Sequence, residues 1–249
     1  MSKNVVIDHR FCGPPDSGNG GYVCGVLAGF IDGAADVTLR QPPPLDRPLV
    51  VEEPAANRVL LREGDEIVAE AQSTKLELDV PNPPAYTKAK EAARRYRGFD
   101  YHPFPTCFVC GPERVEADGL RIFAGPVTGS RMVAAPWMPD VSLVDNRGHV
   151  RPEFLWAVLD CPGYFAALDD QNRSMVLGRL AAKIDDRIKP GEQCVVIGWQ
   201  ISKDGRKHYV GTALFSGSGE LCGQAKATWI QVKELGAGKS PLQPVQRES

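Results

Sequence analysis

The 249-residue chain carries one small folding pattern twice. In each half, an apolar helical stretch comes before a series of short β-like runs: residues 20–30 lead the first half and residues 154–168 the second. The last strands of the two series also align, because EIVAEA at 66–71 matches ELCGQA at 220–225 in position and character. A helix followed by antiparallel hairpins predicts an α+β protein built from two copies of one unit.

The pattern divides the chain into a first unit at 1–80, a linker at 81–105, a second unit at 106–235 and a flexible tail at 236–249. Prolines at 81–84 stop regular structure, and a short helix at 85–96 lies within the linker. That helix is the most basic stretch of the chain, which indicates a solvated face or, alternatively, a contact with the phosphates of a large anionic substrate. The predicted strands lie at 36–40, 48–51, 57–61, 66–71, 120–123, 132–135, 175–184, 193–202, 207–216 and 220–232.

Charge and composition narrow the choice of partners. A net charge of −2 and a pI near 6.1 leave no broad basic field, so we expect neither nucleic acid nor a membrane surface as partner. No apolar run approaches the roughly 20 residues of a membrane span, and the first residues show no apolar signal region, so a cytoplasmic protein is expected. Seven cysteines are too few, and odd in number, for a disulfide framework.

The two halves carry complementary parts of a possible site. Gly18-Asn19-Gly20-Gly21-Tyr22 opens the first helix, and backbone N–H groups at a glycine-rich helix start can hold an oxyanion. Asn19 adds a side-chain donor or simply caps the helix. The second helix has no glycine pair at its start but carries Asp160 in its middle, where the first helix has Ala28.

A carboxylate within an apolar helix is costly unless it is solvated, paired or used. The helical neighbours of Asp160 include no cation, which favours a functional role. Two structural alternatives remain open. Asp160 would cap a new helical segment starting at Pro162, or it would pair with an arginine of the sheet such as Arg179.

Other kinds of site have weaker support. Cys107 and Cys110 form a CxxC pair, but zinc requires four ligands and no second CxxC or histidine pair completes the set. We therefore expect a turn that packs two small side chains, and neither metal nor cofactor. The sequence also lacks HExxH, GxSxG and GxGxxG motifs, which disfavours zinc hydrolases, esterases of the nucleophile-elbow type and dinucleotide enzymes.

Several motifs together resemble the hotdog-fold acyl-CoA thioesterases of the phenylacetate-pathway type. CFVCGP at 107–112 followed by DGLRIF at 118–123 is similar to their opening CxxCG…GLxxxF signature. Asp160 falls where the helix of that family carries its catalytic acid. Asn19-Gly20-Gly21 resembles the HGG helix entrance of the family, with asparagine in place of histidine.

The resemblance implies a tandem double hotdog, with two antiparallel sheets that each wrap around a central helix. It implies a thioesterase with one composite site between the two units, because the family takes the acid from one hotdog and the glycine entrance from the other. The substrate would be an acyl-CoA or acyl-carrier thioester. Asp160, Gly21 and Asn19 are the expected catalytic residues, and Gly20 and Tyr22 the expected substrate-binding residues, with Asp160 acting as general base or nucleophile.

Two other functions remain alternatives. A non-catalytic acyl-thioester-binding protein would keep the pocket but have Asp160 capped, paired or remote from Gly21. An acyl-thioester hydratase or dehydratase would need a histidine paired with an acid, for which His149 and Glu153 are the nearest candidates. Because sheets of this kind leave edges and faces to cover, we also expect the double unit to form a homodimer.

Overall fold

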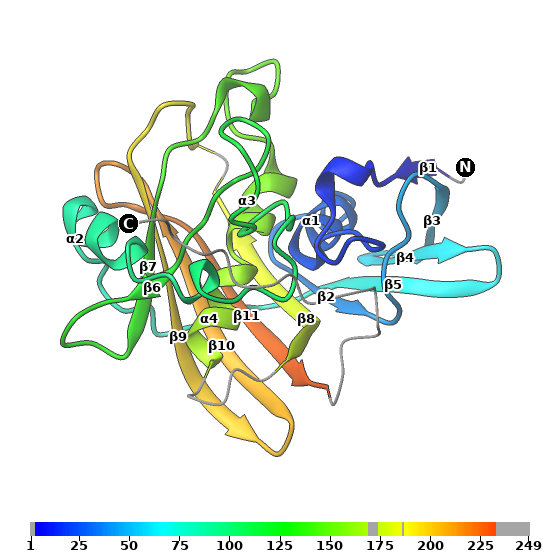
Figure 1. Ribbon diagram of the computed structural model, residues 1–249. Helices are drawn as coiled ribbons and strands as arrows, with labels where there is room; N and C mark the ends of the chain where they lie inside the picture. The colour runs from blue at the N-terminus through cyan, green and yellow to red at the C-terminus, as the bar shows by residue number, and fades with distance from the viewer. Residues whose placement is uncertain (1–2, 169–173, 186, 233–249) are drawn as a thin grey trace.

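The computed structural model describes residues 3–168, 174–185 and 187–232 (Figure 1). Its first half consists of one buried helix and five strands. These elements are β1 (Lys3–Val6), α1 (Gly20–Ala28), β2 (Ala35–Leu39), β3 (Pro48–Ala55), β4 (Arg58–Glu63) and β5 (Glu66–Ser73), with a short 3-10 turn at His9–Phe11.

A connecting segment and a second, larger set of elements follow. They are α2 (Tyr86–Ala93), β6 (Gly125–Pro126), β7 (Met132–Trp137), α3 (Pro152–Val158), α4 (Cys161–Ala167), β8 (Met175–Ile184), β9 (Cys194–Asp204), β10 (Lys207–Phe215) and β11 (Leu221–Gln231). Two further 3-10 turns lie at Arg97–Phe99 and Val141–Leu143.

All the described strands belong to one 11-stranded sheet, in the order β1-β3-β4-β5-β2-β8-β11-β10-β9-β7-β6. The sequence predicted two sheets joined edge to edge, and the hydrogen-bonded ladder is indeed continuous, because β2 and β8 pair antiparallel across the middle. Val37 faces Leu180 and Thr38 faces Arg179 in that pair. Each half would otherwise present an open edge there, with unpaired backbone groups, and the pairing satisfies both edges.

The internal repeat is visible in the strand order. β2 and β8 each follow the helical part of their half, and β5 and β11 lie directly beside them. Ala71 of β5 pairs with Val37, and Ala225 of β11 pairs with Ala182. The matching segments at 66–71 and 220–225 therefore occupy equivalent places in the two halves.

Two sequence predictions about secondary structure were wrong, and one strand was not predicted. Residues 120–123 form no strand, because the N–H groups of Leu120 and Ile122 bond to the carbonyls of Phe108 and Val109 in the preceding loop. The single helix expected at 154–168 is two helices, α3 and α4, with a break at Leu159 and Asp160. The first residues, Lys3–Val6, add strand β1 against β3.

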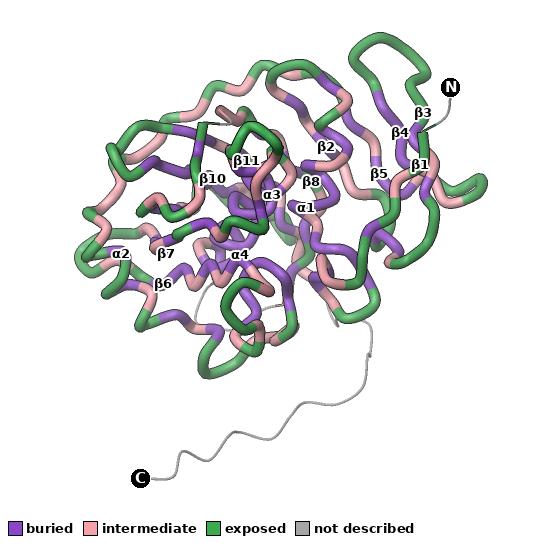
Figure 2. Tube along the Cα trace, turned by 90° about the horizontal axis from the view of Figure 1, so that it is seen from above, coloured by how far each residue is buried: buried purple, intermediate pink, exposed green. Residues whose placement is uncertain are grey.

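The helices α1 and α3 lie side by side within the curve of the sheet, where the trace is largely buried (Figures 1 and 2). Gly21 and Gly25 face α3, one helical turn apart. A Cβ atom on Gly21 would lie 2.4 Å from the Asp160 Cβ, and one on Gly25 would lie 2.6 Å from the Glu153 Cα. The two glycines thus let the helix of one half approach the helix of the other closely.

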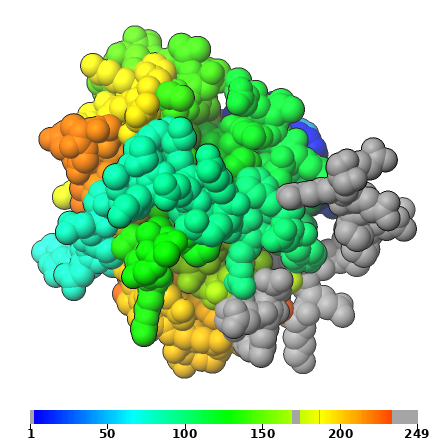
Figure 3. Space-filling view, turned by 60° about the vertical axis from the view of Figure 1, so that its left-hand side comes forward, coloured from blue at the N-terminus to red at the C-terminus, as the bar shows by residue number. Residues whose placement is uncertain are grey.

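Helix α2 lies against the outer face of the sheet, over β7 and β9, and the segment that follows it continues across this side of the molecule (Figure 3). Ala89 and Ala92 are buried there against Ala134, Ile197 and Ala213. Helix α2 therefore packs one side against the sheet and exposes its other side to solvent.

The expected tail at 236–249 lies outside the described residues. Within the described part of the chain, every helix is too short or too polar to cross a membrane.

Candidate active site

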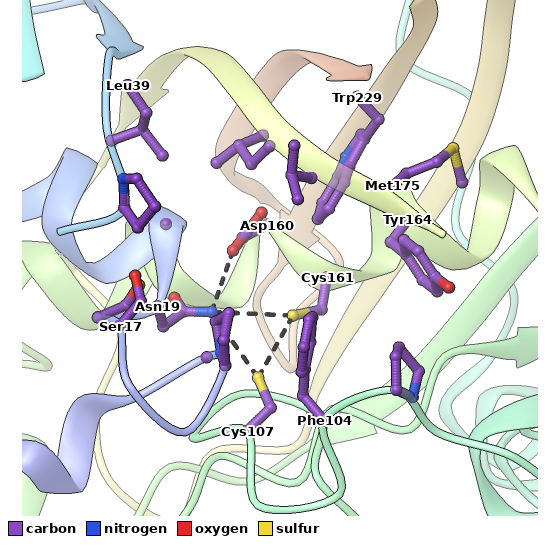
Figure 4. Close-up of a pocket in the computed structure, with 18 of the residues that line it drawn as sticks. Ser17, Asn19, Leu39, Phe104, Cys107, Asp160, Cys161, Tyr164, Met175 and Trp229 are labelled. Carbon is purple, nitrogen blue, oxygen red and sulfur yellow. Dashed lines mark hydrogen bonds between the residues drawn. The ribbon is translucent and has the colours of Figure 1, made fainter. Parts of the chain in front are cut away.

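A cavity of about 370 Å³ lies where the start of α1, the break between α3 and α4, and strand β8 meet (Figure 4). Its size falls within the range of small-molecule sites. Most of its wall is apolar, formed by Leu39, Phe104, Tyr164, Phe165, Met175, Leu177 and Trp229. Among the polar residues of the wall, Asn19 and Asp160 lie next to each other.

Asp160 joins the two halves of the chain at this place. Its Oδ2 atom accepts a hydrogen bond of 2.9 Å from the backbone N–H of Gly21 and one of 3.1 Å from the Asn19 side-chain amide. The Asp160 side chain is buried, with 2% of the residue exposed. The acid and the glycine-rich helix start, predicted from opposite halves, are therefore in direct contact.

The break in the second helical stretch positions the acid. Pro162 has no N–H for a continuing helix, and the Thr212 hydroxyl donates to the Leu159 carbonyl at 2.7 Å. Asp160 stands between α3 and α4 and makes no side-chain cap to α4. Its carboxylate turns instead to α1, so it caps the helix of the other half rather than its own. The alternative partner, Arg179, contacts Asp36 and Thr38.

Compared with water, the surroundings of Asp160 stabilise the neutral carboxyl relative to the charged carboxylate. Burial raises the pKa of the carboxyl to about 7, although the hydrogen bonds from Gly21 and Asn19 act in the opposite direction. The second oxygen, Oδ1, is buried and has no hydrogen-bond partner within the described part of the chain. One oxygen of the carboxylate is therefore fixed, and the other has unused acceptor capacity.

The first three N–H groups of α1 differ in whether they are already hydrogen-bonded. Gly21 donates to Asp160, and Tyr22 donates to the Asn19 Oδ1 atom at 2.9 Å. Gly20 lines the cavity, and its N–H has no hydrogen-bond partner among the described residues. Asn19 has both of the roles that the sequence left open. Its side-chain oxygen caps α1, and its side-chain nitrogen donates a hydrogen bond.

The Tyr22 side chain lies away from this place. Its ring stacks on Phe11 at a centroid distance of 4.2 Å and contacts Phe154, and Tyr22 does not line the cavity. His149 and Glu153, the pair considered for a hydratase, are also missing from the cavity wall formed by the described residues. The same holds for the described residues of the basic helix α2.

Among the wall residues that were not predicted from the sequence, Cys161 and His102 carry a thiol and an imidazole. Cys161 follows Asp160 directly and lies with its sulfur 4.0 Å from that of Cys107. His102 lies 3.2 Å from the Cys110 sulfur through its Nε2 atom. No spacing rule links Cys161 or His102 to the CxxC pair, so only the folded chain shows that they meet it.

No protein-family model matches the chain, and no curated protein matches it by sequence. Solved structures do match its fold. A tesB protein of Mycobacterium avium subspecies paratuberculosis superposes with a TM-score of 0.60 at 14% identity, over 93% of each chain. Acyl-CoA thioesterase II of Mycobacterium marinum gives 0.59 at 13% identity, over 95% of this chain and 94% of the other.

A protein of Alicyclobacillus acidocaldarius described as having a hot dog fold gives a TM-score of 0.56 at 8% identity, over 94% of both chains. Such low identities establish the fold alone. The resemblance seen in the sequence is thereby confirmed at this level: the chain has an α+β hotdog architecture, and its neighbours of thioesterase II type match it over nearly their whole length.

Proposed function

We propose that the protein hydrolyses an acyl thioester at one composite site between its two halves. The observation that carries the proposal is the Asp160 carboxylate, which is buried on the wall of an apolar cavity and held by the start of α1 from the other half. A buried acid with a raised pKa and an unused oxygen is a frequent feature of catalytic sites.

The chemistry needs an oxyanion donor and a group that activates or replaces water. The Gly20 N–H is the donor with free capacity, at the positive end of α1, and it would bind the thioester oxygen as negative charge develops there. The Asp160 Oδ1 atom would take a proton from an attacking water, or attack the carbonyl itself. Gly21 and Asn19 would hold the carboxylate in place through its other oxygen.

The apolar wall suits the acyl group of the substrate. Aromatic and aliphatic side chains such as Phe104, Tyr164 and Trp229 surround the space beside Asp160, and burying an apolar chain there is favourable. The name of the Mycobacterium marinum structure, an acyl-CoA thioesterase II, supports an acyl-CoA as the substrate. A carrier-protein thioester has the same reacting group and is the second form of substrate to test.

One observation favours a second function, acyl-thioester binding without hydrolysis. The Gly21 and Tyr22 N–H groups, two of the three donors at the start of α1, are already bonded to Asp160 and Asn19. If Asp160 serves only as a helix cap, the cavity would hold an acyl group but leave the thioester intact.

Thiol release from a series of acyl-CoA substrates of increasing acyl size tests the proposal, with direct binding measured on the same series. Hydrolysis that saturates with substrate supports the enzyme. Saturable binding with no release of thiol above the uncatalysed rate would favour the binding protein instead.

We also propose that two chains associate, because the ends of the continuous sheet, β1 and β6, leave backbone groups of edge strands open to pairing. Light scattering at micromolar concentration checks this. A mass of 27.1 kDa across the concentration range would contradict it.

A further inference from the structure

Three cysteines from two distant segments meet on the cavity wall. The sulfur atoms of Cys107, Cys110 and Cys161 all lie within 4.8 Å of one another, and those of Cys107 and Cys161 are 4.0 Å apart. All three residues are buried and none is in a disulfide. Figure 4 shows the sulfurs of Cys107 and Cys161 facing each other beside Asn19.

We propose that these three cysteines bind a thiophilic divalent metal ion, with Zn²⁺ as the main candidate. Zinc–sulfur bonds of about 2.3 Å in a tetrahedron place the sulfurs about 3.8 Å apart, close to the Cys107–Cys161 separation. The sequence pattern offered only the two ligands of the CxxC pair, and Cys161 supplies the third. Because all three cysteines line the cavity, its contents can provide the fourth ligand, a water molecule or a substrate atom.

The turn that carries the CxxC pair is built tightly. The Gly111 N–H bonds to the Cys107 carbonyl at 2.9 Å, and a Cβ atom on Gly111 would lie 2.5 Å from the Pro105 carbonyl oxygen. The turn is fixed to the first half of the chain, since the Phe108 N–H donates to the Cys12 carbonyl at 2.8 Å. Two of the ligands are thus preorganised before any metal binds.

Hydrogen-bond donors converge on the sulfurs, as they do around metal-bound thiolates. The His102 Nδ1 atom accepts the Phe104 N–H at 2.9 Å, which places the ring proton on Nε2, and Nε2 lies 3.2 Å from the Cys110 sulfur. The Asn19 amide nitrogen lies 3.8 Å from the Cys107 sulfur and 4.0 Å from that of Cys161. In this arrangement His102 is an outer donor to a thiolate rather than a ligand.

The proposed ligand Cys161 directly follows Asp160 in the chain, so a metal bound there would lie next to the residue proposed to act in hydrolysis. A metal held by Cys107, Cys110 and Cys161 would clamp the loop before β6 onto the start of α4. The same clamp would hold the break that presents Asp160 to α1. The competing explanation is a cluster of three packed thiols with no affinity for metal.

Binding of Co²⁺ to the full-length, reduced protein under anaerobic conditions distinguishes the two, because cobalt bound by thiolates gives charge-transfer absorption that packed thiols do not. Cys110→Ala and Cys161→Ala each remove one proposed ligand. Cys194→Ala is the matched control, because Cys194 is equally buried but does not line the cavity. Zinc content of the purified wild type and displacement of Co²⁺ by Zn²⁺ complete the measurement.

We expect one equivalent of Co²⁺ with thiolate absorption in wild type and in Cys194→Ala, displaced by Zn²⁺. Each variant loses a direct ligand, so its affinity for Co²⁺ should fall by more than the roughly 10- to 100-fold that loss of an outer-shell partner costs. The wild-type spectrum alone decides the matter if a variant does not fold. Absence of thiolate absorption in reduced wild type, or equal metal binding by wild type and Cys110→Ala, would overturn the proposal. None of these readouts depends on hydrolytic activity.

Discussion

The carboxylate of Asp160 accepts a 2.9 Å hydrogen bond from the backbone N–H of Gly21, 139 positions away in the other half of the chain. The contact exists because the N-terminus of α1 lies against the break between α3 and α4, and Gly21 has no side chain to keep the helices apart. One pair of residues thus holds both the interface between the halves and the proposed reactive group.

The first prediction concerns the Gly20 N–H. Gly20→Pro removes this donor at the first position of α1, where proline is tolerated, and Asn19 already has the extended backbone that suits a residue before proline (φ −59°, ψ 129°). If Gly20 binds the developing oxyanion, kcat should fall roughly 10²- to 10³-fold.

Gly20→Ala is its control. It keeps the N–H and adds only a Cβ atom, which would meet the flexible ends of Leu177 and Leu39 at 2.9 and 3.1 Å. Steady-state kinetics of both variants on one acyl-CoA decide the point. Equal losses in the two variants would show that crowding, and not the N–H, accounts for the effect.

The second prediction concerns helix packing. Gly21→Ala places a Cβ atom 2.4 Å from the Asp160 Cβ and 3.0 Å from the Trp156 carbonyl oxygen, so α1 and α3 must separate. Overpacking of this kind costs about 1–3 kcal/mol in the free energy of unfolding. Gly29→Ala, on the exposed end of α1 with an ordinary helical backbone (φ −60°), should change it by less than about 1 kcal/mol. Denaturant titration of both variants measures the difference, and equal stabilities would refute the close-packing account.

The third prediction concerns the break that presents Asp160. Thr212→Val keeps the shape of the side chain but leaves the buried Leu159 carbonyl without the donor it now has at 2.7 Å. An unsatisfied buried group costs roughly 1–3 kcal/mol. Thr212→Ser retains the hydroxyl and should recover most of the lost hydrogen bond. If Val and Ser destabilise the protein to the same degree, the loss comes from packing and the hydroxyl does not support the break.

The fourth prediction follows from the proposed metal site. Removing metal from purified wild type with a chelator should lower its melting temperature, because a ligand that binds only the folded state stabilises it. Cys110→Ala, which lacks one ligand, should lose less melting temperature on chelation than wild type does. If a chelator removes the metal from wild type but leaves its melting curve unchanged, the metal does not stabilise the fold.

The periodic parts of the sequence predicted the sheet well. Strand β8 has the predicted bounds, Met175–Ile184, and the hairpin turn at Gly64 and Asp65 joins β4 to β5 as expected. These features depend on the alternation of apolar and polar residues and on turn-forming residues, and both can be read from residues that are neighbours in the sequence. The break at Asp160 was harder to place, because Pro162 marks a bend but the supporting Thr212 hydroxyl comes from β10, a strand distant in sequence.

The candidate site was only partly visible in the sequence. A buried acid without a nearby cation and a glycine-rich helix start identified Asp160 and the segment from Asn19 to Tyr22. Which of the N–H groups is already used depends on how closely α1 approaches α3, and that distance is set by tertiary packing. The meeting of Cys161 with the CxxC turn is likewise a property of the folded chain, so counting ligands along the sequence could not find it.

The central claim is that Asp160 carries out thioester hydrolysis and does more than cap α1. The most direct measurement is thiol release from a good acyl-CoA substrate by wild type and Asp160→Asn. Asparagine can still accept the Gly21 N–H through its oxygen, so the fold and the cap should persist. Loss of the negative charge should lower the rate by on the order of a hundredfold or more, with thermal stability close to wild type. Wild-type turnover by a folded Asp160→Asn protein would contradict the account.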